Sequence, residues 1–438
     1  MSVRLGVELR DRPMSGMQIS VVALCAALNV LDGFDLQSIS FIAPILSSEW
    51  RLSAGMLGML FSVGLAGIAI GAPLLAVLAD IYGRRRTILM CLALIAVSVS
   101  LSSISTNLLE LMVLRGITGM GIGGMLATIN TMAAEFSSDR RRDLSISVTM
   151  AGFPIGGTLG GILAVYLVAK FDWRAVFVAF GALTAVMLPI VYYWMPESLD
   201  YLAVRRPKNA LQRINSVRRL LRIAPLEQLA PPASRSGGGA IGALARPPLL
   251  RGTVLIGIGF FAVPLAFYFV LSWMPKLLVD LGLSVRGGIS SSVFMNMGGI
   301  LGGVGYGVIA VNWGRRRVAV VAMLLAFVTA VSFGFAPLVL SLLLIGSSVV
   351  GVFMFAAFTS LYALVPGLYP PGVRASGTGL ALGVGRTGAL LGPYAGGLLI
   401  AAGWGSHNYL IVMMLPFLAG ALAVGCLPRE VDQGTLAD

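Results

Sequence analysis

The stretch Val30-Leu31-Asp32-Gly33-Phe34-Asp35-Leu36-Gln37 places two carboxylates inside a long apolar segment, residues 17–46. A segment of that length can cross a bilayer as a helix. Each aspartate near its middle costs about 2.5–3.5 kcal/mol to insert, and such residues usually face protein or a water-filled path. The stretch therefore predicts a membrane-spanning helix that contributes an ionisable site to the interior of a helical bundle.

Asp32 and Asp35 are three residues apart, so a helix places them on one face. Two like charges that close in a low dielectric oppose each other's ionisation, and one proton is then held unusually tightly. The pair indicates a proton-handling site. The structural alternative is that one aspartate only caps or pairs with a neighbouring helix.

The composition is that of a polytopic membrane protein. Hydrophobic residues make up 57% of the 438 residues and charged residues 11%, against roughly 25% charged in soluble domains. Twelve apolar segments are predicted to span the membrane: 17–46, 56–79, 87–105, 108–134, 144–168, 174–195, 252–279, 289–311, 318–336, 338–365, 375–401 and 408–427.

The net charge of +13 is distributed over alternate connections. One set of connections carries Arg4, Arg10, Arg12, Arg84, Arg85, Arg86, Arg140, Arg141, Arg142, Arg315, Arg316, Arg317 and most of the basic residues of 196–250. The other set carries only Arg51, Lys170, Arg174, Lys276 and Arg286. This asymmetry predicts that both termini are cytoplasmic. The basic excess sets the topology, and we expect no nucleic acid partner.

The two halves of the chain repeat. Gly83 and the three arginines after it return at Gly314, an offset of 231, and Gly156 corresponds to Gly388 at an offset of 232. Repeated halves are typical of secondary transporters, which bind substrate between them near the midplane. We predict six-helix bundles at 1–195 and 251–438, joined by a cytoplasmic linker at 196–250 with a short helix at about 208–222.

The connection after the second span, Asp80-Ile81-Tyr82-Gly83-Arg84-Arg85, resembles the D-[RK]-x-G-[RK]-[RK] loop of the major facilitator superfamily. It departs from that pattern at Ile81, and its second copy has Val311 in place of the acid. The resemblance implies a major facilitator fold of twelve transmembrane helices in two pseudo-symmetric six-helix halves. It also implies a gating loop that includes Asp80, Gly83, Arg84, Arg85, Glu135 and Arg142.

Within that superfamily the chain resembles the aromatic acid:proton symporters. Their D-G-x-D signature stands here at 32–35, their S-W-x-P at 272–275 and their G-x-G-R-x-G-A at 383–389. The resemblance implies uptake of a benzoate-like carboxylate with a proton, as part of aromatic hydrocarbon catabolism, in the bacterial inner membrane. We expect a monomer that needs no cofactor, with the aromatic acid, the proton and the lipid bilayer as its partners.

Arg115 and Arg386 are the two arginines well inside predicted spans. Asp35 and Arg115 lie at similar depths, about 16 Å and 12 Å from the outer ends of their spans, so an ion pair is expected. That pair could be structural or could take part in coupling, and Arg115 is also a candidate substrate-binding residue together with Arg386. Arg386 lies near the midplane, where its half of the chain offers no acid, and a guanidinium there suits a substrate carboxylate. The alternative is that Arg386 caps backbone carbonyls beside Gly385 and Gly388.

Aromatic residues in the spans are candidates to stack on a substrate ring. They are Phe34, Phe267, Tyr268, Trp273, Phe358 and Tyr362. Asn130 and Asn296 are polar and mid-span, and are expected to make interhelical hydrogen bonds.

Other functions fit the same composition. Symport of a non-aromatic organic acid and proton-driven export of a drug are alternatives within transporters, and a transporter-like membrane sensor is one from another class. An enzyme is not expected: the cysteines have no metal-ligand spacing, His407 is the sole histidine, and no G-x-S-x-G motif stands over a cavity. We also expect no metal site.

Overall fold

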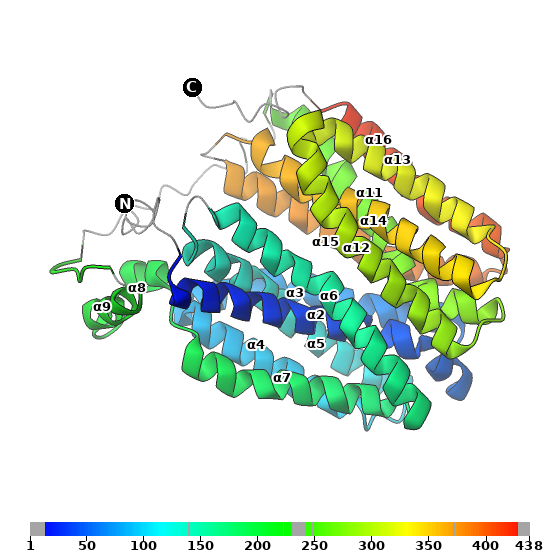
Figure 1. Cartoon of the computed structure of the whole chain (residues 1–438), viewed down its shortest axis with the longest axis horizontal. Coiled ribbons are helices and arrows are strands. Elements are labelled where there is room, and N and C mark those ends of the chain that lie inside the picture. Colours follow the sequence, from blue (N-terminus) through cyan, green and yellow to red (C-terminus); the bar gives the residue numbers. More distant parts are fainter. Residues whose placement is uncertain are drawn as a thin grey trace. The chain divides into compact units, whose positions relative to one another are not determined.

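The structure, a computed structural model, describes residues 14–138, 141–221, 223–229, 242, 244, 246–247, 249–370 and 373–427. Within these residues every regular element is an α-helix, and Figure 1 shows the helices coloured along the chain. The predicted all-α membrane fold is confirmed. Several predicted features lie outside the described residues, namely Arg4, Arg10, Arg12, Arg140 and the Pro- and Gly-rich part of the linker at 231–239.

Twelve long helices correspond to the predicted spans. They are α2 (Gly16–Glu49), α3 (Ala54–Tyr82), α4 (Arg84–Ser102), α5 (Leu108–Glu135), α6 (Arg142–Lys170), α7 (Arg174–Trp194), α11 (Leu249–Asp280), α12 (Val285–Trp313), α13 (Arg315–Gly334), α14 (Leu340–Leu368), α15 (Arg374–Ala401) and α16 (Ser406–Gly425). Among the described residues, eleven helices are apolar and long enough to cross a membrane. The helix outside that set is α15, which carries Arg386 and eight glycines in its 28 residues.

The helix starts show the repeat in the backbone. Helix α4 begins directly after Gly83, with φ 105°, and α13 begins directly after Gly314, with φ 86°. Both conformations favour glycine, which has no Cβ to clash. At Gly83 a Cβ would also lie 2.3 Å from Oε2 of Glu197. The two copies of the Gly-Arg-Arg-Arg motif therefore make the same sharp turn between consecutive helices.

The chain forms two compact units. The first consists of Met1–Leu36, Gly67–Gly156 and Phe177–Ser236, and the second of Gln37–Ala66, Gly157–Val176 and Gly237–Asp438. Helices α2, α3, α6 and α7 contribute residues to both units. The division into bundles 1–195 and 251–438 with a linker at 196–250 stays a prediction.

Glycines let pairs of helices cross closely, at equivalent places in the two units. In the first unit, a Cβ built on Gly156 of α6 would lie 2.0 Å from the carbonyl oxygen of Val30 in α2. In the second unit, a Cβ built on Gly388 of α15 would lie 2.0 Å from the carbonyl oxygen of Phe261 in α11. A side chain cannot occupy such a gap, so small residues are required for these helices to pack. The repeat inferred from the spacing of glycines is thus a repeat of helix crossings.

The described part of the linker packs as a small helical element of the first unit. It contains α8 (Leu199–Arg205) and α9 (Ala210–Leu220), of which α9 matches the predicted helix at 208–222 and α8 was not foreseen. Asn215 of α9 holds the chain that follows by bonding both the N–H and the C=O of Leu226, at 2.8 and 2.9 Å. The buried Arg218 donates from Nε to the carbonyl of Ala224.

A substitution at the α11–α15 crossing tests this packing. Gly388→Ala should lower the thermal unfolding temperature of the purified protein, because overpacking typically costs about 1–3 kcal/mol. Gly379→Ala is the matched control in the same helix, where an added Cβ meets nothing within 4 Å. The control should unfold at or above the parent's temperature, since alanine favours a helix over glycine by about 1 kcal/mol. Equal unfolding temperatures for the two variants would contradict the crossing.

Candidate functional site

A buried ion pair joins α2 to α5 inside the first unit. The Arg115 guanidinium donates Nη1 to Oδ1 of Asp35 at 3.0 Å and Nη2 to Oδ2 at 3.1 Å. The same Nη2 also donates to the backbone carbonyl of Asp35 at 2.9 Å. Both residues are 3% exposed, and the guanidinium lies 5.9 Å from the ring centre of Phe177. The ion pair expected from the depths of the two residues is therefore present, in a two-pronged arrangement.

This geometry offsets the cost of taking two charges out of water. A planar guanidinium matches a carboxylate in two parallel hydrogen bonds, which are stronger than bonds between neutral groups. Removing one partner of a buried pair costs roughly 3–5 kcal/mol because the other charge is left uncompensated. The two charges therefore stabilise each other only as a pair.

Asp32 lies about one turn before Asp35 in α2 and is 1% exposed. Its carboxylate interacts electrostatically with Cys91, which α4 contributes from the same unit. Phe34, which lies between the two acids in the sequence, stacks on Phe180 of α7 with ring centres 5.3 Å apart. Phe34 therefore packs among the helices of the first unit.

Four of the predicted ring-stacking residues lie together in the second unit. Phe267 and Tyr268 come from α11, and Phe358 and Tyr362 from α14. The Phe267 and Phe358 rings stack with centres 4.6 Å apart, and Tyr362 lies 5.3 Å from Phe358. Tyr268 meets Phe267 edge-on at 5.3 Å. Together they form an aromatic wall with two phenol groups.

Helix α15 packs near this aromatic wall at Arg386: a Cβ on the preceding Gly385 would lie 3.1 Å from Phe260, whose ring centre is 5.5 Å from that of Tyr362. Its guanidinium interacts electrostatically with the phenol groups of Tyr268 and Tyr362, and the residue is only partly buried. Within the described residues Arg386 makes no hydrogen bond and no ion pair, with side chains or with backbone carbonyls. The alternative in which Arg386 caps carbonyls beside Gly385 and Gly388 is therefore not what the structure contains. A cation beside aromatic rings can bind an aromatic anion.

Trp273 lies elsewhere in the second unit. Its indole N–H donates to the carbonyl of Pro393 at 3.0 Å, and its ring meets Phe61 of α3 edge-on at 5.3 Å. Nearby, a Cβ on Gly58 would lie 3.1 Å from the Cα of Gly397. Trp273 thus braces a close contact of α3, α11 and α15, and is not part of the aromatic wall around Arg386.

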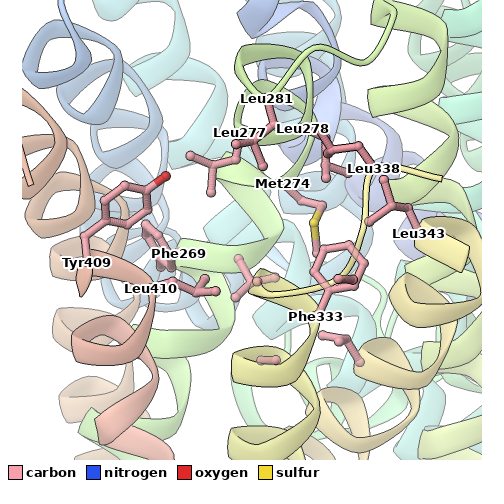
Figure 2. A pocket seen from close by; sticks show the side chains of 15 residues that line it. Phe269, Met274, Leu277, Leu278, Leu281, Phe333, Leu338, Leu343, Tyr409 and Leu410 are labelled. Atoms are coloured by element: carbon pink, nitrogen blue, oxygen red, sulfur yellow. The ribbon is translucent and has the colours of Figure 1, made fainter. Parts of the chain in front are cut away.

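A separate pocket in the second unit is almost wholly apolar. Figure 2 shows it between α11, α13, α14 and α16, with the Tyr409 hydroxyl as the polar group among its labelled side chains. Leu277, Leu278, Phe333 and Leu343 are among its lining residues, and none of the described residues that line it is charged. A carboxylate placed there would lose its hydration without gaining a positive partner. This pocket is therefore a poor site for an organic anion.

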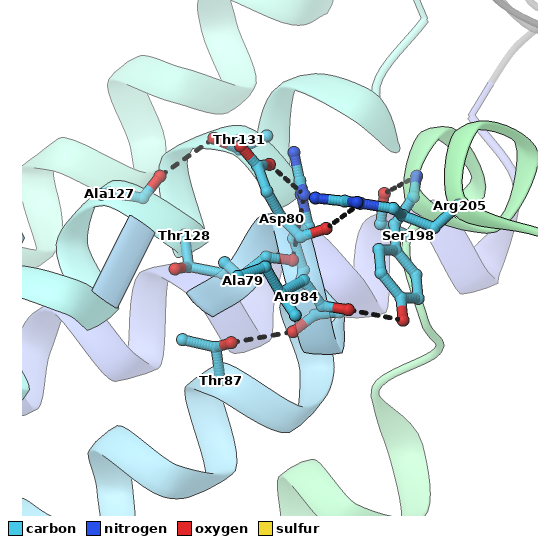
Figure 3. Close-up of polar contacts among 12 residues, drawn as sticks. Ala79, Asp80, Arg84, Thr87, Ala127, Thr128, Thr131, Ser198 and Arg205 are labelled. Carbon is cyan, nitrogen blue, oxygen red and sulfur yellow. Dashed lines mark hydrogen bonds and ion pairs between the residues drawn. The ribbon is translucent and has the colours of Figure 1, made fainter. Parts of the chain in front are cut away.

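The connection between α3 and α4 is held by a polar network, drawn in Figure 3. Arg84 donates to Asp80 at 2.6 Å and lies 3.8 Å from Glu135 at the end of α5. Arg205 of α8 donates from Nε to the carbonyl of Asp80 at 2.9 Å. These contacts join three of the predicted gating residues to the linker helix.

A second set of contacts completes the network around Gly83. Glu135 accepts from the hydroxyl of Ser198, and Glu197 accepts from the backbone N–H of Arg85 at 3.0 Å. Arg142, in contrast, is exposed at the first residue of α6. Loop, α5 and linker are thus tied at one end of the first unit. No group of three or more His, Cys, Asp or Glu residues that could hold a metal occurs in the described part of the chain.

Comparison with known proteins identifies the family. The family model described as Major Facilitator Superfamily matches residues 25–339 and 306–436. The chain belongs to the major facilitator superfamily. Among solved structures, it resembles the inward open xylose transporter XylE from E. coli, with a TM-score of 0.72 and 18% identity over 94% of this chain and 96% of that one. The major facilitator fold expected from the loop motif is confirmed.

Curated relatives narrow the place of the chain within the superfamily. It is 31% identical to a gallate transporter of Pseudomonas putida, over 94% of this chain and 92% of the relative. It is 29% identical to the 4-hydroxybenzoate transporter PcaK of Pseudomonas aeruginosa, over 96% of this chain and 95% of the relative. The chain is thus a multi-pass membrane transporter related to aromatic acid transporters, and its relatives are not enzymes.

Some residues near these sites were not foreseen. Gln37 was not singled out, although it bonds to Asn296, for which an interhelical hydrogen bond was expected. Phe355 extends the aromatic wall and lies 4.8 Å from Phe267. Gln37 is a polar residue inside an apolar span, two residues after Asp35. That position is the feature of the sequence from which its buried hydrogen bond could be predicted.

A double-mutant cycle on Asp35 and Arg115 tests the buried pair. Arg115→Leu and Asp35→Asn should each lower thermal stability at neutral pH, by roughly 3–5 kcal/mol where a charge stays buried alone. The double variant should lose less than the sum of the two single losses. The control is the exposed pair of Arg174 with Glu49, 3.4 Å apart, whose removal in Arg174→Gln should cost at most about 1 kcal/mol. Additive losses at Asp35 and Arg115 would contradict an energetic coupling.

Proposed function

We propose that the chain takes up an aromatic carboxylate together with a proton, by alternating access of its two repeated halves. Its membership of a superfamily of secondary transporters is established above, and the substrate and the coupling ion are the proposal. The observation that carries it is the position of Arg386, a cation with no ion pair among the described residues, beside the phenols of Tyr268 and Tyr362.

Arg386 supplies the charge that an organic acid needs, and the aromatic wall supplies the ring contact. Guanidinium binds carboxylate in two parallel bonds, and hydrogen bonds to charged groups contribute about 1.5–3 kcal/mol each. Edge-on and stacked ring pairs add about 0.5–1.5 kcal/mol beyond their buried area. A non-aromatic acid would use Arg386 but not the rings, so the wall favours an aromatic substrate. An exporter of cationic drugs would place an acid at this depth instead.

The proton site in this proposal is Asp35 with Asp32. Protonation of Asp35 releases Arg115, which then no longer binds a carboxylate on α2. Helix α2 runs without interruption from Gly16 to Glu49, so Asp35 in the first unit and Gln37 in the second are two residues apart in one helix. A change in the ion pair can therefore bias a helix that both units share. This is the kind of bistable element that couples two binding events.

We further propose that the network around Asp80 is a gate on the cytoplasmic side of a bacterial inner membrane. The alternating distribution of arginines supports this orientation, with both termini in the cytoplasm. In this proposal Asp80, Gly83, Arg84, Arg85 and Glu135 form the gate, and Arg142, exposed at the start of α6, joins it only when the gate moves. The second half has Val311 in place of the acid. The latch is therefore expected to be stronger in the first half.

Substitution of Arg386 tests the carboxylate site. Lysine keeps the charge but loses the planar fork, so Arg386→Lys should weaken binding of a benzoate-type acid, and Arg386→Ala should weaken it further, by tenfold or more. An uncharged amide analogue should bind both variants about as weakly as it binds the parent. Arg219→Ala, on the exposed face of α9, is the control and should bind the acid like the parent. Equal weakening for acid and amide in calorimetric titrations would refute the carboxylate assignment.

Substitution of the aspartates tests coupling. Asp32→Asn and Asp35→Asn should each abolish accumulation of labelled substrate against its gradient in proteoliposomes under an imposed pH gradient. Both variants should still insert and still bind substrate, because Arg386 is unchanged. Asp172→Asn, at an exposed acid that pairs with Arg174 at 2.7 Å, is the control and should accumulate like the parent. Parent-like accumulation by both aspartate variants would exclude them as the proton site, and no accumulation by the parent would favour a sensor.

A further inference from the structure

A cluster of neutral polar side chains is buried in the second unit. The amides of Gln37, from α2, and Asn296, from α12, bond to each other in both directions: Nε2 of Gln37 donates at 3.2 Å and Nδ2 of Asn296 donates at 2.8 Å. Asn296 also donates to the backbone carbonyl of Ser292, one turn earlier in α12, at 2.8 Å. Gln37 is 1% exposed, and Asn296 and Ser292 are 0% exposed.

This cluster holds more donors and acceptors than it uses. Each amide oxygen accepts one of the two hydrogen bonds that it can accept, and Nε2 of Gln37 uses one of its two N–H groups. The Ser292 hydroxyl oxygen is buried and has no hydrogen-bond partner among the described residues. Leaving a buried hydroxyl unpaired is unfavourable. A group that both donates and accepts would complete the set, and a hydroxyl does both.

Helix α6 also passes the Gln37 and Asn296 amides, and its Gly157 leaves room for them. A Cβ built on Gly157 of α6 would lie 2.1 Å from Nε2 of Gln37 and 2.6 Å from Oδ1 of Asn296. Any side chain at residue 157 would therefore displace the amides. Glycine is required at position 157 because the two amides approach its Cα closely. Its φ is not positive, so backbone conformation is not the reason.

The cluster is linked to the aromatic wall through α12 and α14. Gly299, one turn after Asn296, packs directly on Phe355, since a Cβ there would lie 2.4 Å from that ring. Phe355 in turn contacts Phe267 of the wall. Asn296 is 11 residues from the start of α12 and Arg386 is 15 residues from the end of α15. Because consecutive membrane helices run in opposite directions, the start of α12 and the end of α15 lie on the same side of the membrane. The depths of Asn296 and Arg386 below that side then differ by roughly 6 Å.

We propose that Gln37, Asn296 and Ser292 form a hydroxyl-binding subsite that selects ring-hydroxylated aromatic acids over unsubstituted ones. The inference rests on the proposed function, because it takes Arg386 as the carboxylate site of the same ligand. The contacts from Gly299 through Phe355 to Phe267 link the cluster to the aromatic wall, and Asn296 and Arg386 lie within about one helical turn of each other in depth. When the ring hydroxyl arrives, it donates to an amide oxygen and accepts from Ser292 or from the free N–H of Gln37.

The expected selectivity is moderate. A site that hydrogen-bonds a substrate hydroxyl rejects the analogue that lacks it when its own polar groups are then left unpaired. Here the two amides can return to each other when benzoate binds, so only part of the cluster is left unsatisfied. We therefore expect the parent to bind 4-hydroxybenzoate about tenfold more tightly than benzoate, a factor that corresponds to about 1.4 kcal/mol.

The test is a calorimetric comparison of benzoate with 2-, 3- and 4-hydroxybenzoate on the purified full-length protein and two variants. Ser292→Ala removes a hydroxyl that bonds nothing among the described residues, so folding should be preserved. Asn296→Leu removes the amide pair. Both should lose most of the preference for 4-hydroxybenzoate through weaker binding of that ligand, while binding of benzoate is retained. The matched control is Ser291→Ala, the neighbouring buried serine, whose hydroxyl donates to Gly287 within its own helix at 3.1 Å.

The outcomes separate this inference from the function on which it rests. A parent that binds benzoate and 4-hydroxybenzoate equally well overturns the subsite and leaves the carboxylate site standing. The same holds if the preference survives in Ser292→Ala and Asn296→Leu, or falls equally in Ser291→Ala. A parent that binds none of the four acids overturns the proposed function and the subsite together. If Asn296→Leu fails to fold, the comparison of Ser292→Ala with Ser291→Ala still decides.

Discussion

The ion pair between Asp35 and Arg115 is the interaction on which the first unit depends. Two charges 3.0 Å apart and 3% exposed are stable in a helical bundle only when their geometry is close to ideal. The helices around them must therefore approach closely. A Cβ on Gly33 would lie 2.1 Å from the carbonyl oxygen of Phe153, which shows how tightly α2 packs on α6 next to Asp35. The glycines of this unit thus allow the close helix packing that holds the charge pair in place.

The two halves share their helix crossings but not their charges. Val30 in the first half corresponds to Phe261 in the second, and by the same spacing Asp35 corresponds to Ala266. Gly156 corresponds to Gly388, and by that spacing Arg386 corresponds to Pro154. The first half has kept an acid and a base that neutralise each other. The second has a cation, Arg386, that interacts electrostatically with two phenol groups and that no described acid pairs with. A common backbone therefore carries two different electrostatic sites. This suits a carrier that binds a proton and an anion, because neither charge has to cross the hydrocarbon alone.

Much of this arrangement could be predicted from the sequence. The spans followed from hydropathy, the repeat from glycine and arginine spacing, and the pairing of Arg115 from its depth. Phe34 and Trp273 are predicted to stack on a substrate ring, but Phe34 stacks on Phe180 within the first unit and Trp273 donates to Pro393, because depth along a helix says nothing about the direction in which a side chain points. These helices are apolar on nearly every face, so periodicity could not supply that direction. Gln37 was missed because its partner is 259 residues away in sequence.

The central claim is that binding of the substrate anion and protonation of the Asp32/Asp35 pair are linked. By reciprocity, each must then change the affinity for the other. The most direct measurement is proton exchange when 4-hydroxybenzoate is added to concentrated purified protein in a weakly buffered solution with a pH indicator. The account predicts net uptake of protons by the parent, reduced in Asp35→Asn protein that still binds the acid. Binding of the acid without any proton exchange, over the pH range in which the protein is stable, would contradict it.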